Sequence, residues 1–310
     1  MSKIAYIFPG QGSQVVGMGK DLFDNHQAAR EAFNEADLAI GFSLSEMCFS
    51  GNDEDLQLTA NTQPAILAAS IAAYRAMKAA GAPPPAFVAG HSLGEYSALV
   101  ATGAIKLSDA VKLVRKRGTY MQEAVPIGTG AMAAILGSDI ETIERACVEA
   151  ADGQVCSLAN INSPSQVVIA GNTEAIDRAC ELLKAKGAKR AIKLNVSAPF
   201  HCDLMKPAAE RLINDLESTD LGGFSVPVVT NVEAGPNDSP ERVADLLIRQ
   251  VWSPVLWLQS VRKMIDLGVD TFIEVGPGKV LTGLIRQIEP NVRYAAVGDS
   301  ESLRATLETL

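Results

Sequence analysis

Along most of the chain, short apolar runs alternate with longer segments in which apolar residues recur at helical spacing. The run Ile4–Phe8 predicts a buried strand, and Phe87–Gly90 predicts a second one. Two helices are expected between them, at 21–36 and at 63–80, and the second is rich in alanine. Because strands that are apolar throughout and alternate with helices are typical of sheets covered on both faces, we expect a mostly parallel sheet.

The segment that begins near residue 130 has a different order of elements. It predicts a strand, a helix, two strands, a second helix and a strand, at Ala131–Leu136, Ser138–Ala151, Val155–Ile161, Val167–Ala170, Thr173–Lys186 and Arg190–Val196. This is the order of a ferredoxin-like unit. We therefore predict an α/β fold in which residues 1–127 and 199–310 form a large α/β-hydrolase-like domain with a mostly parallel sheet. Residues 128–198 are expected to form an inserted ferredoxin-like small domain.

The remaining segments complete the large domain. Their pattern predicts helices at 108–123, 207–217 and 240–250, a strand at 226–230 and a last strand at 271–275. The last strand runs into a turn, Gly276-Pro277-Gly278, and a helix that begins at Val280. Because this turn lacks the lysine and the spacing of a phosphate-binding loop, we expect it to be structural.

Composition and charge narrow the range of functions. The 310 residues are 47% hydrophobic and 20% charged, which is ordinary for a folded globular protein. The formal net charge of −9 argues against nucleic acid or an anionic membrane as the main partner. The five cysteines are odd in number and lack the close spacing of a metal site, which favours a reducing compartment and no bound metal. The N-terminal residues show neither a signal peptide nor a membrane-spanning segment, so we expect a cytoplasmic protein.

Ser92 is the strongest candidate for a nucleophile. It stands in Gly90-His91-Ser92-Leu93-Gly94, between a predicted strand and a predicted helix, which is the G-x-S-x-G pattern of a nucleophile elbow. The backbone N–H of Leu93 opens the helix beside the hydroxyl, in a position that suits an oxyanion. The alternative is a glycine-flanked serine in an ordinary loop between a strand and a helix.

A nucleophilic serine needs a base, and three histidines are available. His91 adjoins Ser92 on the turn, where consecutive side chains diverge, and His26 lies on an early helix with a surface-like pattern. His201 follows the predicted small domain at a junction between domains, where clefts tend to form. We therefore take His201 as the candidate base, against the alternative of a histidine satisfied in the core.

Arg117 is an unexpected residue in its helix. The apolar stripe of helix 108–123 includes position 117, so the guanidinium is expected to face inward, whereas Arg115 and Lys116 fall off the stripe. A buried guanidinium is costly without an anion. The spacing leaves open whether that anion is a structural carboxylate or a ligand.

A Ser-His pair in an α/β context suggests a hydrolase, but the order of residues fits the α/β-hydrolase enzymes poorly, since 109 residues follow His201. The chain instead resembles, over essentially its full length, the malonyl-CoA:acyl carrier protein transacylases of bacterial type II fatty-acid synthesis. The matching pieces are Phe8-Pro-Gly-Gln-Gly-Ser-Gln14, Gly90-His-Ser-Leu-Gly94, Arg117, Asn160-Ile-Asn-Ser-Pro-Ser-Gln166 and Phe200-His201.

This resemblance implies that a malonyl group moves from malonyl-CoA to the phosphopantetheine thiol of acyl carrier protein through a malonyl-serine. Ser92 and His201 would form the catalytic pair, and the backbone N–H groups of Gln11 and Leu93 would hold the oxyanion. The backbone carbonyl of Gln250 would orient the histidine. No cofactor is implied, because the CoA thioester is a substrate.

The resemblance also assigns the substrate pocket and the partner. Arg117 would bind the free carboxylate of malonyl through two hydrogen bonds, Phe200 would crowd larger acyl groups, and Met121 would help to keep water out. For the acidic carrier, the best basic cluster is Lys184, Lys186, Lys189 and Arg190, whose alternative role is that of solvated charges at a helix end.

Two other functions stay open from the sequence. A serine hydrolase or thioesterase would release the acyl group to water, and a catalytically idle interaction module would not need Ser92. The sequence indicates neither the range of acyl groups accepted nor whether the carrier serves fatty-acid or polyketide synthesis, and we expect a monomer.

Overall fold

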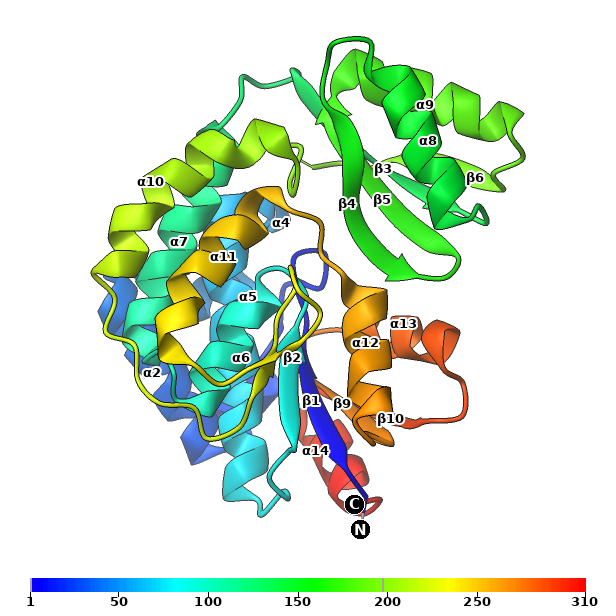
Figure 1. Ribbon diagram of the computed structural model, residues 1–310. Coiled ribbons are helices and arrows are strands. Elements are labelled where there is room, and N and C mark those ends of the chain that lie inside the picture. Colours follow the sequence, from blue (N-terminus) through cyan, green and yellow to red (C-terminus); the bar gives the residue numbers. More distant parts are fainter. Residues whose placement is uncertain (1, 197) are drawn as a thin grey trace.

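The computed structural model describes residues 2–196 and 198–310 and shows two separate sheets (Figure 1). The larger sheet lies among most of the helices, and the smaller one lies at one end with its own two helices. The α/β fold class, with a mostly parallel sheet and a separate antiparallel one, is confirmed. The boundaries at 128 and 198 stay a prediction, and residue 197 of the predicted small domain lies outside the described residues.

The larger sheet has the strand order β10-β9-β1-β2-β7-β8. Its strands are β1 Ile4–Phe8, β2 Phe87–Gly90, β7 Val228–Val229, β8 Pro236–Asn237, β9 Thr271–Val275 and β10 Arg293–Val297. All neighbours are parallel except β8, which is antiparallel to β7. The strand predicted at 226–230 is thus shorter, and the prediction that 271–275 is the last strand is wrong. β10 was missed because it is an edge strand with Arg293 and Tyr294 exposed, which interrupts the apolar pattern.

The alternation along β1 explains why this strand is apolar throughout. Ile4, Tyr6 and Phe8 face a core shared with α2 Gln27–Ile40, α5 Thr59–Ala79, α6 Gly94–Thr102 and α7 Leu107–Glu123. Ala5 and Ile7 face the opposite core, which is shared with α12 Trp257–Asp266 and α13 Val280–Ile288. Figure 1 shows these two helix groups on opposite sides of the sheet. Helices therefore bury both faces of β1, as a parallel sheet requires.

The first predicted helix, 21–36, is divided into two. α1 Lys20–Asn25 and α2 are separated by His26, whose backbone is extended at φ −126° and ψ 118°. The imidazole Nε2 of His26 lies 3.0 Å from Ser300 Oγ, at the start of α14 Ser300–Leu307. The two residues are 274 positions apart in the sequence. The contact at the break between α1 and α2 could therefore not be predicted from a local pattern. Two further short helices, α3 Leu44–Ser50 and α4 Asp53–Gln57, were also missed.

The smaller sheet has the strand order β4-β5-β3-β6, with every pair antiparallel. Its elements run β3 Gly130–Leu136, α8 Ile140–Ala151, β4 Cys156–Ser163, β5 Gln166–Asn172, α9 Thr173–Ala185 and β6 Arg190–Lys193. Element order and strand order are those of the ferredoxin-like unit. β6 ends three residues earlier than predicted, and Leu194–Val196 instead line a cavity.

Backbone hydrogen bonds beside the predicted site join the smaller sheet to the segment around Val255. Val255, which follows helix α11 Val243–Trp252, donates its N–H to Ala159 O at 2.9 Å and accepts the N–H of Ile161 at 2.9 Å. Strand β4 of the small domain is therefore fixed directly to the segment that follows α11.

The predicted helix 240–250 is a short 3₁₀ turn, Pro240–Arg242, that continues into α11. Helix α10 Lys206–Glu217 agrees with its prediction.

At the start of α13, after the glycine turn that follows β9, backbone N–H groups that could bind a phosphate already have a partner within the chain. The buried carboxylate of Glu274 already accepts the N–H of Leu281 at 3.1 Å and the N–H and hydroxyl of Thr282 at 2.7 Å each. A carboxylate of this chain thus satisfies the positive end of the helix. This arrangement supports the structural role that the sequence predicts for the turn.

No helix in the described part of the chain is long and apolar enough to cross a membrane.

Candidate active site

Ser92 occupies a tight turn between β2 and α6. Its backbone has φ 50°, in the left-handed region that a non-glycine residue adopts at a cost of about 1–3 kcal/mol. The Ser92 N–H donates to Asn231 Oδ1 at 2.7 Å, and Asn231 Nδ2 donates to Gly90 O at 2.7 Å, so one amide side chain brackets the turn. The nucleophile elbow predicted from the sequence is thus present as a strand, a strained turn and a helix.

Gly90 and Gly94 permit this turn because the strand and the helix approach each other closely. A Cβ at Gly90 would lie 1.9 Å from the carbonyl of Gly94, and a Cβ at Gly94 would lie 2.1 Å from Phe8 O. These contacts are with backbone atoms, which cannot move aside as a flexible side chain can.

Gly90→Ala is therefore expected to lower the free energy of unfolding by about 3 kcal/mol, as measured by urea denaturation. Gly283→Ala is the matched control, because Gly283 is exposed on helix α13 and a Cβ there meets no atom within 4 Å. That variant should be unchanged or more stable by about 0.5–1 kcal/mol. Equal stability of Gly90→Ala and the wild type would contradict the packing described for the elbow.

Ser92, His201 and Gln250 form a continuous chain of hydrogen bonds. Ser92 Oγ lies 2.7 Å from His201 Nε2, and His201 Nδ1 lies 2.8 Å from the backbone oxygen of Gln250. Since a carbonyl oxygen only accepts, Nδ1 carries the proton and the lone pair of Nε2 faces the serine hydroxyl. The structure therefore brings together the predicted nucleophile, base and histidine-orienting carbonyl.

The surroundings of His201 keep its imidazole neutral. The residue is 3% exposed, and burial, reinforced by the positive charge of Arg117, lowers the pKa of His201 to about 3. The hydrogen bond to the Gln250 carbonyl opposes this shift without reversing it. A neutral imidazole can accept the serine proton, which is the requirement for a general base.

Arg117 is fully buried and faces the same point as His201. Its Nη2 donates to Ser92 Oγ at 3.1 Å and to Gln250 Oε1 at 2.9 Å, and its Nη1 donates to Gln63 Oε1 at 2.8 Å. Arg117 makes no ion pair with a carboxylate within residues 2–196 and 198–310, and its buried Nε has no hydrogen-bond partner there. These contacts favour a ligand as the anion for Arg117 over a structural carboxylate in direct contact.

A cavity of about 310 Å³ opens in front of these residues. It is lined by seven of the eight predicted site residues, namely Gln11, Ser92, Leu93, Arg117, Met121, Phe200 and His201. The eighth, Gln250, is fully buried behind the cavity. The backbone N–H groups of Gln11 and Leu93 have no acceptor within the described residues. They follow the neighbouring parallel strands β1 and β2, whose carboxyl ends meet at one edge of the sheet.

Comparison with known proteins agrees with this chemistry. A family model described as an acyl transferase domain matches residues 5–300. The chain belongs to the acyl transferase family. It is 49% identical over 311 residues to the malonyl CoA-acyl carrier protein transacylase of Bacillus subtilis, which covers 100% of this chain and 98% of that protein. It is 50% identical over 308 residues to the protein of the same name from Escherichia coli K12, covering 99% and 100% of the two chains. The resemblance inferred from the sequence motifs is confirmed.

Solved structures give the same result for the fold of this acyl transferase. An acyl carrier protein S-malonyltransferase from Vibrio cholerae superposes with a TM-score of 0.96 at 49% identity, covering 98% of this chain and 100% of the other. A malonyl-transacylase in complex with a type II PKS acyl-carrier protein superposes with a TM-score of 0.97 at 48% identity, covering 100% of both chains.

Several residues of the acyl transferase site were missed by the sequence analysis. Asn231 directly follows the predicted strand 226–230, so its place at the carboxyl end of a parallel strand was a usable signal. Gln63, which holds Arg117, lies on a helix whose pattern indicated only packing. His91 Nε2 lies 2.8 Å from Asn162 Oδ1 and thereby links the elbow to β4, a contact that no local pattern indicates.

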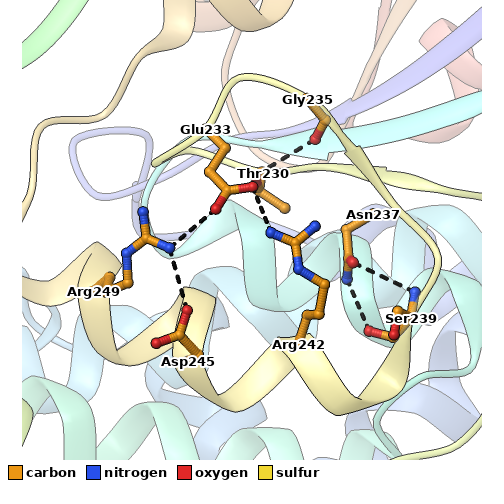
Figure 2. Close-up of polar contacts among 8 residues, drawn as sticks. All are labelled: Thr230, Glu233, Gly235, Asn237, Ser239, Arg242, Asp245 and Arg249. Atoms are coloured by element: carbon orange, nitrogen blue, oxygen red, sulfur yellow. Dashed lines mark hydrogen bonds and ion pairs between the residues drawn. The ribbon is translucent and has the colours of Figure 1, made fainter.

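A surface cluster anchors the hairpin that carries Asn231. Figure 2 shows Glu233 between Arg242 and Arg249, to which its carboxylate lies 2.6 Å and 3.0 Å away. These two hydrogen-bonded arginines hold the pKa of Glu233 below its usual range. Such exposed pairs contribute little stability individually. Here they join the hairpin to α11, and so connect the segment of Asn231 with the segment of Gln250.

Within the described residues, no cluster of three or more His, Cys, Asp or Glu side chains could hold a metal ion, and all five cysteines are free.

Proposed function

We propose that this acyl transferase moves a malonyl group from malonyl-CoA to the phosphopantetheine thiol of an acyl carrier protein, through a malonyl ester on Ser92. One observation carries the proposal: Ser92 Oγ lies between a neutral imidazole at 2.7 Å and a buried guanidinium at 3.1 Å. A base and a fixed cation beside one hydroxyl suit a substrate that has both an acyl carbon and a negative charge. The names of the relatives and of the solved neighbours support the same assignment.

In the first transfer, Ser92 Oγ attacks the thioester carbonyl while His201 Nε2 takes the hydroxyl proton. The N–H groups of Gln11 and Leu93 would stabilise the oxyanion that forms. As this intermediate collapses, the bond between carbon and sulfur breaks, and His201 returns the proton to the CoA thiolate. The second transfer reverses these steps: the carrier thiol gives its proton to His201 and attacks the ester, and Ser92 leaves with that proton.

Arg117 would select malonyl through the free carboxylate. Its planar fork lies at the cavity, with a buried Nε donor that has no partner in the described part of the chain. An acetyl group has no carboxylate and would leave this buried charge without its anion. Met121 and Phe200, both buried against the cavity, limit the space for larger acyl groups.

Arg117→Ala is expected to lower the kcat/KM for malonyl-CoA by about a hundredfold and to leave that for acetyl-CoA within about threefold of the wild type. The measurement is the rate of acyl-enzyme formation with each thioester. Arg115→Ala is the matched control, because it removes the same charge from the same helix outside the cavity. Equal losses with both thioesters would assign Arg117 a structural role.

For the carrier, we propose a docking surface of Lys184, Lys186, Lys189 and Arg190, all exposed, which runs from the last turn of α9 to the first residue of β6. Lys186 pairs with Glu149 at 2.7 Å, whereas the other three make no ion pair within the described residues. β6 continues from Arg190 towards Leu194, which lines the cavity. The surface is thus connected to the rim by one short strand.

Reversing two of these charges, in Lys189→Glu with Arg190→Glu, is expected to raise the KM for the carrier about tenfold and to leave labelling by malonyl-CoA unchanged. The control pair is Arg262→Glu with Lys263→Glu, which makes the same change in charge on the exposed face of α12. An unchanged carrier KM, or equal effects of the two pairs, would remove this surface from the proposal.

The direct test of the function mixes the protein with malonyl-CoA in the presence and the absence of pantetheinylated carrier. We expect malonyl-carrier and free CoA in equal amounts with the carrier, and very little malonate without it. Release of malonate at the same rate without a thiol acceptor would instead identify a hydrolase.

A further inference from the structure

Glu95 is a buried carboxylate beside the site that the proposed mechanism does not use. It is 2% exposed and lies in the first turn of α6, three residues after Ser92. Its Oε2 accepts the Gln250 side-chain Nε2 at 2.8 Å and the backbone N–H of Asn231 at 3.0 Å. A carboxylate is rarely buried to this extent without a specific role for its charge.

Both partners of Glu95 hold site residues on their other side. Asn231 accepts the Ser92 N–H, and the Gln250 side chain donates to Ser92 O at 3.0 Å. Gln250 Oε1 accepts Nη2 of Arg117 at 2.9 Å, and the Gln250 backbone oxygen accepts His201 Nδ1. The side chains of Arg117 and His201 and the backbone of Ser92 are therefore each two hydrogen bonds away from one carboxylate.

The direction of the Gln250 amide is a feature that Glu95 helps to fix. An ionised carboxylate only accepts hydrogen bonds, so it requires the NH₂ end of the amide, and this turns Oε1 towards the guanidinium. A neutral amide at position 95 can present either end and would also permit the reversed orientation, with NH₂ facing the NH₂ groups of Arg117. Glu95 thus reinforces the orientation that is also favoured by the Ser92 backbone oxygen, which accepts Nε2 at 3.0 Å, and by Arg117 Nη2, which donates to Oε1 at 2.9 Å.

Glu95 also places a negative charge near Arg117 without making a hydrogen bond to its guanidinium. The charges of Glu95 and Arg117 attract each other, yet the Gln250 amide lies between them and the two make no direct ion pair. A carboxylate in direct contact would compete with the ligand for the guanidinium. The spacing keeps donors of Arg117 free for the carboxylate of a substrate.

We propose that Glu95 is a positioning residue, whose ionised carboxylate fixes the direction of the Gln250 amide and thereby holds the fork of Arg117 toward the acyl group. This inference rests on the proposed malonyl transfer, because it concerns the clamp on the malonyl carboxylate.

The test compares wild type and Glu95→Gln, an isosteric change, in the rate of acyl-enzyme formation from malonyl-CoA and from acetyl-CoA by intact mass. We expect a loss of about tenfold or more with malonyl-CoA and of less than about threefold with acetyl-CoA. In an Arg117→Ala background, the same change should lower malonyl labelling by less than about threefold, because the interaction that it disturbs is already absent.

The outcomes separate this inference from the function on which it rests. If the wild type forms no malonyl adduct, the proposed function fails. If the wild type does form it and Glu95→Gln keeps the same ratio of malonyl to acetyl rates, the role of Glu95 alone is overturned. A loss that is the same with and without Arg117 also overturns it. Should Glu95→Gln fail to fold, Glu95→Asp retains the charge, and its ratio must exceed that of an Arg117→Ala enzyme for the inference to stand.

The pH dependence gives a readout that a merely structural role would not change. Burial raises the pKa of Glu95 to about 7, opposed by its two hydrogen bonds and by Arg117 of α7, while Tyr96 of α6 faces it as a neutral phenol. The malonyl preference of the wild type should therefore decrease as the pH falls through about 7. In Glu95→Gln it should be low and independent of pH in this range, because burial and the charge of Arg117 hold the pKa of His201 well below it. A decrease that persists in Glu95→Gln contradicts the assignment.

Discussion

Ser92→Ala is expected to lower malonyl transfer to the carrier by about 10⁴-fold or more. The hydroxyl is the atom that the imidazole and the guanidinium both approach, at 2.7 Å and 3.1 Å. Without it no ester can form, and the remaining oxyanion donors and binding contacts act only on direct attack by the thiol. The measurement is the steady-state rate of malonyl-carrier formation at saturating malonyl-CoA.

Ser97→Ala is the control for Ser92→Ala, because it removes a hydroxyl from a buried position in α6, the helix that follows the Ser92 turn, outside the cavity. Its transfer rate should stay within about threefold of the wild type. A Ser92→Ala enzyme with more than about a tenth of the wild-type rate would exclude a serine ester as the main route.

His201→Ala is expected to lower the rate of acyl-enzyme formation by about 10³- to 10⁴-fold. The imidazole is held by the Gln250 carbonyl at 2.8 Å and is neutral because its pKa is about 3, so the base is ready at neutral pH without prior deprotonation. Stopped-flow or quenched labelling with malonyl-CoA measures this step.

The double variant Ser92→Ala with His201→Ala should be no slower than Ser92→Ala alone, because the two residues act as a unit. Losses that multiply would mean that His201 works independently of the serine. His91→Ala distinguishes the two histidines: its ring pairs with Asn162 Oδ1 and not with Ser92, so its effect on acylation should be much smaller.

The nucleophile could be predicted from the sequence because its signal is local. Gly90, Ser92 and Gly94 lie within five positions, and the geometry that they permit depends on their own backbone and on the strand and helix beside them. The alternation of strands and helices in the large sheet was also visible, since β1 is buried on both faces and its residues are apolar accordingly.

The polar support of the site was not visible, because it is built from distant segments. The contact of Asn231 with Glu95 spans 136 positions, and that of Ser92 with Gln250 spans 158. One signal was available for Glu95: it is the one charged residue of Gly94–Thr102, a helix that is buried nearly all round. A charge in such a segment indicates a paired group, although the partner is known only from the fold.

The most direct test of the account is the intact mass of the protein after brief incubation with malonyl-CoA, followed by peptide mapping and then by addition of pantetheinylated carrier. We predict one malonyl group per chain, located on Ser92, which leaves the protein and is recovered on the carrier thiol. An unmodified protein that nevertheless supports transfer, or a malonyl group on another residue, would contradict the Ser92 ester on which the mechanism depends.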